Sequence, residues 1–89
     1  MDSKQRAELR ALASKEEAIF QIGKGGITPN VVAAIDSALT ARELIKITIL
    51  RNSEEDPKEV LRLLAAQLNA EPVAAIGFKV ILYRKKKDK

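Results

Sequence analysis

The stretch IGKGGITPN, residues 22–30, combines residue types that can bind an anion. Three of the four glycines of the chain lie within residues 23–26, with Lys24 among them, and Thr28-Pro29 follows. Glycine lets another backbone approach closely, and the first N–H groups of a helix lack intrahelical partners and favour negative charge. Lys24 adds an ammonium group. The spacing therefore predicts a phosphate site where a strand ends and a helix begins.

The same glycines also suit a simple strand-to-helix turn, and GxxG alone does not separate the two interpretations. A nucleotide-hydrolysing loop is disfavoured, because neither G-x-x-x-x-G-K-[ST] nor G-x-G-x-x-G occurs. The chain has no histidine and no cysteine, which excludes a zinc site built on them and histidine acid–base catalysis. The acidic residues 54–56 precede Pro57 and indicate a solvated loop and a helix cap. We therefore expect no enzyme, no cofactor and no metal.

Basic residues elsewhere could extend the phosphate site into a surface that follows a nucleic-acid backbone. Residues 84–89 contain five basic residues and one acidic residue, which accounts for the net charge of +4 of the whole chain. Two phenylalanines and one tyrosine offer little base stacking, so we expect phosphate and shape recognition with steep salt dependence. The candidate contact residues are Gly23, Lys24, Gly25, Gly26, Thr28, Lys4, Arg6, Arg10, Lys46, Arg84, Lys85 and Lys86.

Hydrophobic periodicity predicts the elements that position these residues. Ser3, Thr28 and Asp56 are the expected helix caps, and Gly77 is the expected turn between the last two strands. Glu59 could complete a capping box with Asp56. In chain order the prediction is helix 3–14, strand 18–22, helix 28–42, strand 44–50, a helix from 57 to about 69, and two strands within 73–83.

The order α-β-α-β-α-β-β favours a two-layer α/β domain in which three helices pack on a mixed four-stranded sheet. Ile45, Ile47 and Ile49 alternate onto one face of their strand, with Lys46 on the other face. Whether the first helix covers that second face is left open by the sequence. The chain contains no run of about 18–20 apolar residues and no apolar signal-peptide core, so we expect a cytoplasmic protein without a membrane segment.

Four stretches carry a family resemblance across nearly the whole chain: KQRAELRALA (4–13), IGKGGIT (22–28), ALTARELIKITIL (38–50) and AAIGFKVILYR (74–84). Together they resemble the CRM domain, named for chloroplast RNA splicing and ribosome maturation, in its single-domain bacterial YhbY-like form. Family members often have a proline about five residues before the first loop glycine, where this chain has Ala18. That departure bears on the entry into the first strand and leaves the loop intact.

The resemblance implies a fold similar to the C-terminal domain of bacterial translation initiation factor three. It implies an RNA-binding module in which residues 23–26 belong to the RNA surface, with Lys4, Arg6 and Arg10 beside them. Because bacterial members are associated with large-subunit precursors, we expect the protein to bind large-subunit ribosomal RNA and to assist ribosome assembly. We also expect a monomer. Residues 1–84 would form one domain and residues 85–89 a flexible basic tail. The alternative is a protein-interaction adaptor on ribosomal particles that uses Ile81 and Tyr83 on the second sheet face.

Overall fold

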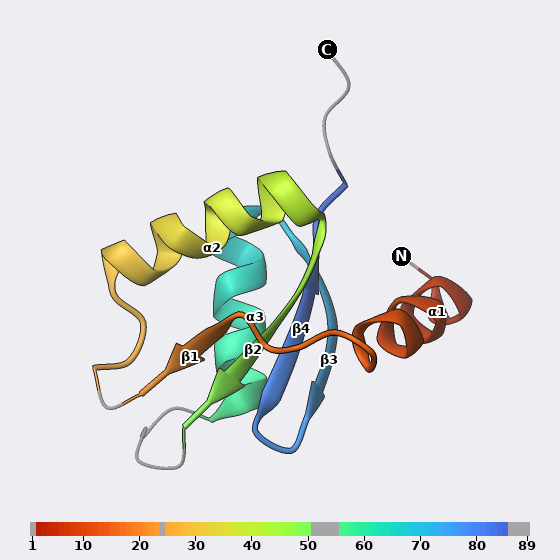
Figure 1. Ribbon diagram of the computed structural model, residues 1–89, viewed down its shortest axis with the longest axis horizontal. Coiled ribbons are helices and arrows are strands. Elements are labelled where there is room, and N and C mark those ends of the chain that lie inside the picture. The colour runs from red at the N-terminus through yellow and green to blue at the C-terminus, as the bar shows by residue number, and fades with distance from the viewer. Residues whose placement is uncertain (1, 24, 51–55, 86–89) are drawn as a thin grey trace.

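The structure, a computed structural model, describes residues 2–23, 25–50 and 56–85. Within these residues the order of helices and strands is the predicted one (Figure 1). The elements are α1 (Ser3–Ala13), β1 (Phe20–Ile22), α2 (Pro29–Arg42), β2 (Leu44–Ile49), α3 (Pro57–Leu68), β3 (Glu71–Ile76) and β4 (Lys79–Tyr83). The predicted fold class, an α/β domain with three helices and a mixed four-stranded sheet, is confirmed. Among the strands, β3 begins two residues earlier than expected.

The sheet has the strand order β1-β2-β4-β3. β1 runs parallel to β2, with Phe20 opposite Ile47, and β4 runs antiparallel to β2, with Val80 opposite Ile47. β4 also pairs antiparallel with β3. After β2 the chain therefore passes through α3 to β3 at the far edge of the sheet. It then returns in a hairpin, so that β4 lies between β2 and β3. Gly77 makes that hairpin turn with φ 58°, as its position predicted.

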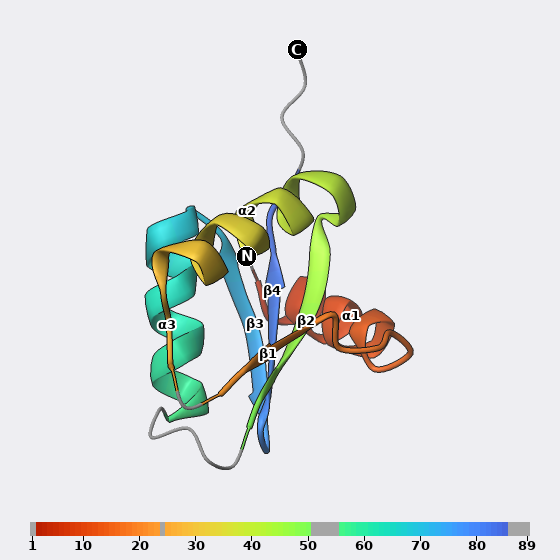
Figure 2. The ribbon, with the colours of Figure 1, turned by 60° about the vertical axis from the view of Figure 1, so that its left-hand side comes forward.

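The alternating isoleucines of β2 form the centre of the core. Ile45, Ile47 and Ile49 are each at most 2% exposed and pack with buried side chains of α2 and α3. Figure 2 shows α2 and α3 on one side of the sheet and α1 on the other. The first helix thus adds a layer to the predicted two, and the question that the sequence left open is answered.

Three buried residues, Ala13, Val73 and Ile81, hold α1 against the second face of the sheet. Lys46 lies on this face, as predicted, and its Nζ donates to the carbonyl oxygens of Ala13 at 3.5 Å and Glu16 at 3.4 Å. These carbonyls lie at and just beyond the C-terminus of α1, where a cation is favoured. Ile81 is only 1% exposed. The surface that the adaptor hypothesis assigned to it is therefore buried, and that part of the hypothesis is wrong.

Two details of the predicted helix starts are also wrong. The N-cap of α1 is Asp2 and not Ser3, because the Asp2 carboxylate is placed to accept from the Gln5 N–H at 2.8 Å. Asp56 is the N-cap of α3 as predicted, but its side chain makes no capping hydrogen bond. Glu59, expected in a capping box, instead pairs with Arg62 one turn further on, which offers a full opposite charge.

Arg84, directly after β4, joins the C-terminal half of α2 to the end of α3. Its guanidinium donates to Asp36 Oδ1 at 2.7 Å, and to the Asp36 carbonyl and Thr40 Oγ1 of α2, both at 2.9 Å. It also donates to the Leu68 carbonyl at the end of α3, at 2.9 Å. The side chain is 21% exposed, so these charge-assisted bonds are partly shielded from water. We call this set of four bonds the Arg84 clamp.

Replacing Arg84 by alanine removes the whole clamp and leaves the Leu68 carbonyl without this donor. We expect the free energy of unfolding to fall by about 1–3 kcal/mol, because several charge-assisted hydrogen bonds are lost together. Arg84→Lys should recover only part of the loss, since an ammonium cannot reproduce the planar fork of a guanidinium. Urea unfolding followed by circular dichroism measures both variants.

Arg62 provides the matched control, because its side chain is 73% exposed and forms an ion pair within one helix. We expect Arg62→Ala to change the free energy of unfolding by at most about 0.5 kcal/mol. Equal unfolding midpoints for Arg84→Ala and the unaltered protein would show that the clamp does not stabilise the fold.

Candidate functional site

The glycine loop leaves the end of β1 as a tight bend, at the opposite end of the long axis of the molecule from α1 (Figure 1). The Gly26 N–H donates to the Gly23 carbonyl at 2.9 Å, and Gly26 has φ 67°. A side chain is strained in that conformation, so the turn itself requires glycine at this position. The bond also engages the Gly26 amide, which is therefore not available to a ligand.

Gly25 has no such structural requirement. It is exposed, its φ lies outside the positive region, and a Cβ built on it would meet no atom within 4 Å. Its N–H makes no hydrogen bond to any residue that the structure describes. The bend therefore presents bare main chain to solvent at Gly25, where the fold itself would accept a side chain.

The start of α2 offers fewer free donors than the sequence suggested. Thr28 is the N-cap, as predicted, and its Oγ1 accepts from the Val31 N–H at 3.2 Å. The Val32 N–H donates to the Thr28 carbonyl at 3.0 Å, and Pro29 has no N–H. Within the described part of the chain, this leaves the Asn30 N–H as the unbonded amide of the first turn. The Thr28 hydroxyl can still donate its own proton.

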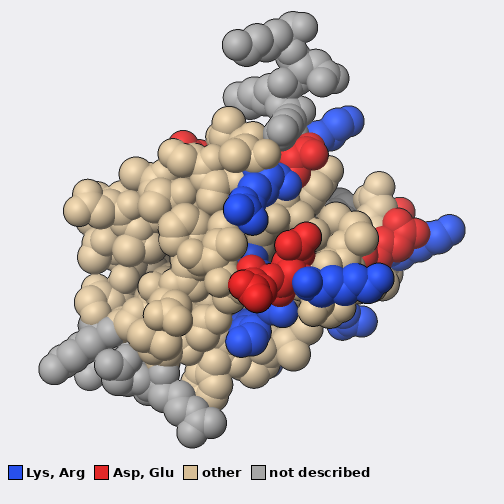
Figure 3. All heavy atoms as spheres, viewed as in Figure 1, with Lys and Arg blue, Asp and Glu red and all other residues tan. Residues whose placement is uncertain are grey.

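The chain segment that contains the bend carries little charge. Residues 18–35 contain one charged residue, Lys24, which lies outside the described residues. On the face in Figure 3, described acidic and basic side chains gather towards α1, whereas none is visible over β1 and the start of α2. A phosphate at the bend would therefore meet no carboxylate from this segment.

The structure does not bring the basic candidates of α1 to the glycine loop. Lys4, Arg6 and Arg10 are exposed, but Figures 1 and 2 both place α1 far from the bend, on the other side of the sheet. The expectation that these residues lie beside the loop is therefore wrong. They remain candidates for a separate contact with an extended ligand.

Two other candidates are engaged inside the protein. Lys46 donates to the Ala13 and Glu16 carbonyls, and Arg84 forms the Arg84 clamp, so both side chains are directed to partners within the protein. Lys85 is exposed, and Lys86 lies outside the described residues. The sequence predicted unpaired N–H groups at this helix start without naming Asn30, whose place directly after Pro29 could have indicated it.

The described ranges contain neither a metal-binding cluster nor a membrane-spanning helix. No group of three or more histidine, cysteine, aspartate or glutamate side chains there could hold a metal ion. None of the described helices combines the length and the hydropathy needed to cross a bilayer.

The chain is similar to several proteins whose names refer to RNA binding. The chain is 40% identical over 88 residues to the Bacillus subtilis protein named "Probable RNA-binding protein YqeI", covering 99% of this chain and 92% of that one. It is 30% identical over 84 residues to a Haemophilus influenzae protein named "RNA-binding protein", covering 94% and 85%. The solution structure of protein SAV1595 from Staphylococcus aureus matches with a TM-score of 0.84 and 42% identity, covering 99% and 92%.

The profile of one protein family, described as the CRS1 / YhbY (CRM) domain, matches residues 1–84. This confirms the resemblance drawn from the four sequence stretches. With its helices and mixed sheet in the expected order and its glycine bend before α2, the chain belongs to the CRS1 / YhbY (CRM) domain family.

Proposed function

We propose that this protein binds RNA at the glycine bend, residues 23–26, and at the first turn of α2. The observation that carries the proposal is Gly25, an exposed residue whose N–H has no acceptor among the described residues. The fold does not require glycine at this position, because a Cβ built there would meet nothing. Relatives named as RNA-binding proteins support the class of ligand.

A phosphate group fits the donors of this region. The Gly25 and Asn30 N–H groups and the Thr28 hydroxyl are the neutral donors, and Lys24 adds positive charge by sequence. Main-chain amides at a helix start bind phosphate without reading the base, so these contacts position the RNA and do not specify its sequence.

We further infer that the RNA is large-subunit ribosomal RNA in precursor particles and that binding assists ribosome assembly. The family resemblance supports this target. The absence of histidine and cysteine supports a non-enzymatic role without a cofactor. We place the protein in the cytoplasm as a monomer that associates with ribosome precursors.

Gly25→Asp tests the bend directly. A carboxylate at this position repels phosphate, so we expect the affinity for large-subunit ribosomal RNA to fall at least about tenfold, equivalent to roughly 1.4 kcal/mol. Gly25→Ala should weaken binding less, because it adds bulk without charge. Both variants should unfold at the temperature of the unaltered protein, since the added Cβ meets nothing. Filter binding at fixed salt measures the affinities.

Ser37→Asp is the matched charge control, because Ser37 is exposed on α2 and lies outside the bend. It should leave the affinity within about twofold of the unaltered value, as expected for one distant, screened charge. If Gly25→Asp bound this RNA as tightly as Ser37→Asp, the bend would not be the RNA site.

Deleting residues 85–89 tests the role of the basic tail. The deletion removes four lysines and one aspartate, so the plot of log affinity against log salt should become shallower by roughly 2 to 3. The ratio of affinities for ribosomal RNA and an unrelated RNA should stay the same, because flexible lysines act through counterion release. If the deletion made the affinities for the two RNAs equal, the tail would be the part that selects the RNA.

A further inference from the structure

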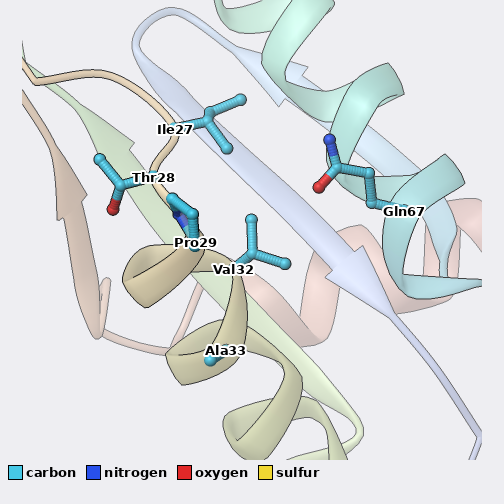
Figure 4. Close-up of a pocket in the computed structure, with 6 residues that line it drawn as sticks. All are labelled: Ile27, Thr28, Pro29, Val32, Ala33 and Gln67. Atoms are coloured by element: carbon cyan, nitrogen blue, oxygen red, sulfur yellow. The ribbon is translucent and has the colours of Figure 1, made fainter.

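An open hollow of about 470 Å³ lies beside the bend, between the start of α2 and the C-terminal half of α3. Figure 4 shows the Gln67 amide of α3 pointing across it towards Ile27 and Val32. The lining residues are Ile27, Thr28, Pro29, Val32, Ala33 and Gln67. The lining is therefore mostly apolar. Its polar side chains are the Thr28 hydroxyl beside the bend and the Gln67 amide on the opposite side.

None of the described residues that line the hollow is charged, so this lining does not suit a phosphate or an ionised side chain. It suits a flat, uncharged group that buries a face against aliphatic side chains. The Gln67 amide supplies both N–H donors and a carbonyl acceptor, the combination that pairs with the edge of a nucleobase. Tyr83 and Phe78 are not part of the lining, so such a base would lie on aliphatic groups.

Thr28 belongs both to the hollow and to the helix start beside the bend. Its Oγ1 is therefore within the reach of a phosphate at the bend, while its neighbours Ile27 and Pro29 form the hollow. An uncharged hollow directly beside an anion-binding bend matches the charge pattern of a single nucleotide. Single-stranded RNA presents its bases splayed out from the backbone in this way.

We propose that this hollow holds one unstacked nucleobase of the RNA strand whose backbone lies on the bend, with Gln67 bonded to the edge of the base. The inference rests on the proposed function and goes beyond it, because it assigns a base-binding site to a domain whose other contacts are phosphate contacts.

Ala33→Leu tests the hollow by filling it. Ala34→Leu is the matched control, since both alanines are exposed neighbours on α2 and Ala34 does not line the hollow. Both substitutions are compatible with a helix. The two probes are a single-stranded RNA decamer of mixed sequence and a ribose-phosphate decamer that lacks its bases.

The unaltered protein should bind the RNA decamer about tenfold more tightly than the baseless chain, the order of magnitude of one accommodated base. Ala33→Leu should abolish that difference by weakening only the RNA decamer. Ala34→Leu should keep the difference. Fluorescence anisotropy at fixed salt measures each dissociation constant.

Gln67→Glu tests the amide. Because the carboxylate loses the N–H donors and favours the cytosine amino group, the preference between oligo(A) and oligo(C) should shift towards oligo(C). Ala66→Glu adds the same charge at an exposed neighbouring position of α3 outside the lining and should weaken both oligonucleotides equally.

The outcomes separate this inference from the proposed function. If Ala33→Leu and Ala34→Leu behave alike while Gly25→Asp still weakens both decamers, the bend binds the backbone and the base site is wrong. If the unaltered protein binds neither decamer nor ribosomal RNA, the proposed function fails as well. Loss of binding to a protein partner in Ala33→Leu, with unchanged RNA binding, would also overturn the base site.

Discussion

The hydrogen bond from the Gly26 N–H to the Gly23 carbonyl closes the bend on which the candidate interface depends. It engages one amide of the loop, requires a positive φ at Gly26 and leaves Gly25 exposed with bare main chain. Thr28 then caps α2 by accepting from the Val31 N–H. The candidate interface is therefore sparse, with two unbonded amides and a hydroxyl among the described residues, and Lys24 is the charged residue that the sequence places in this segment.

The basic residues of the chain divide into groups with different tasks. Lys46 and Arg84 bond within the fold, one at the end of α1 and the other between the C-terminal half of α2 and the end of α3. The basic residues of α1 lie at the other end of a molecule whose longest extent is 35 Å. A ligand that contacts both α1 and the bend must be extended, as a nucleic-acid strand is. The net charge of the chain does not distinguish these groups from one continuous basic surface.

The features that the sequence predicted correctly depend on local patterns. Thr28-Pro29 marks the start of α2, alternating isoleucines identify β2, and Gly77 marks the hairpin. The features that it missed depend on distant partners. Arg84 bonds to groups 48, 44 and 16 residues away, so its position in a basic run indicated nothing about the clamp. The burial of Ile81 depends on where α1 docks, and the hollow depends on how α2 faces α3.

The most direct test of the account is amide mapping by nuclear magnetic resonance on the ¹⁵N-labelled protein during titration with the RNA decamer. We expect the Gly25 and Asn30 amide resonances to move most and to lower field, because these N–H groups gain phosphate acceptors. The resonances of α1 should move less. If the largest changes fell on α1 while Gly25 and Asn30 stayed in place, RNA would bind elsewhere and the bend would be only a turn.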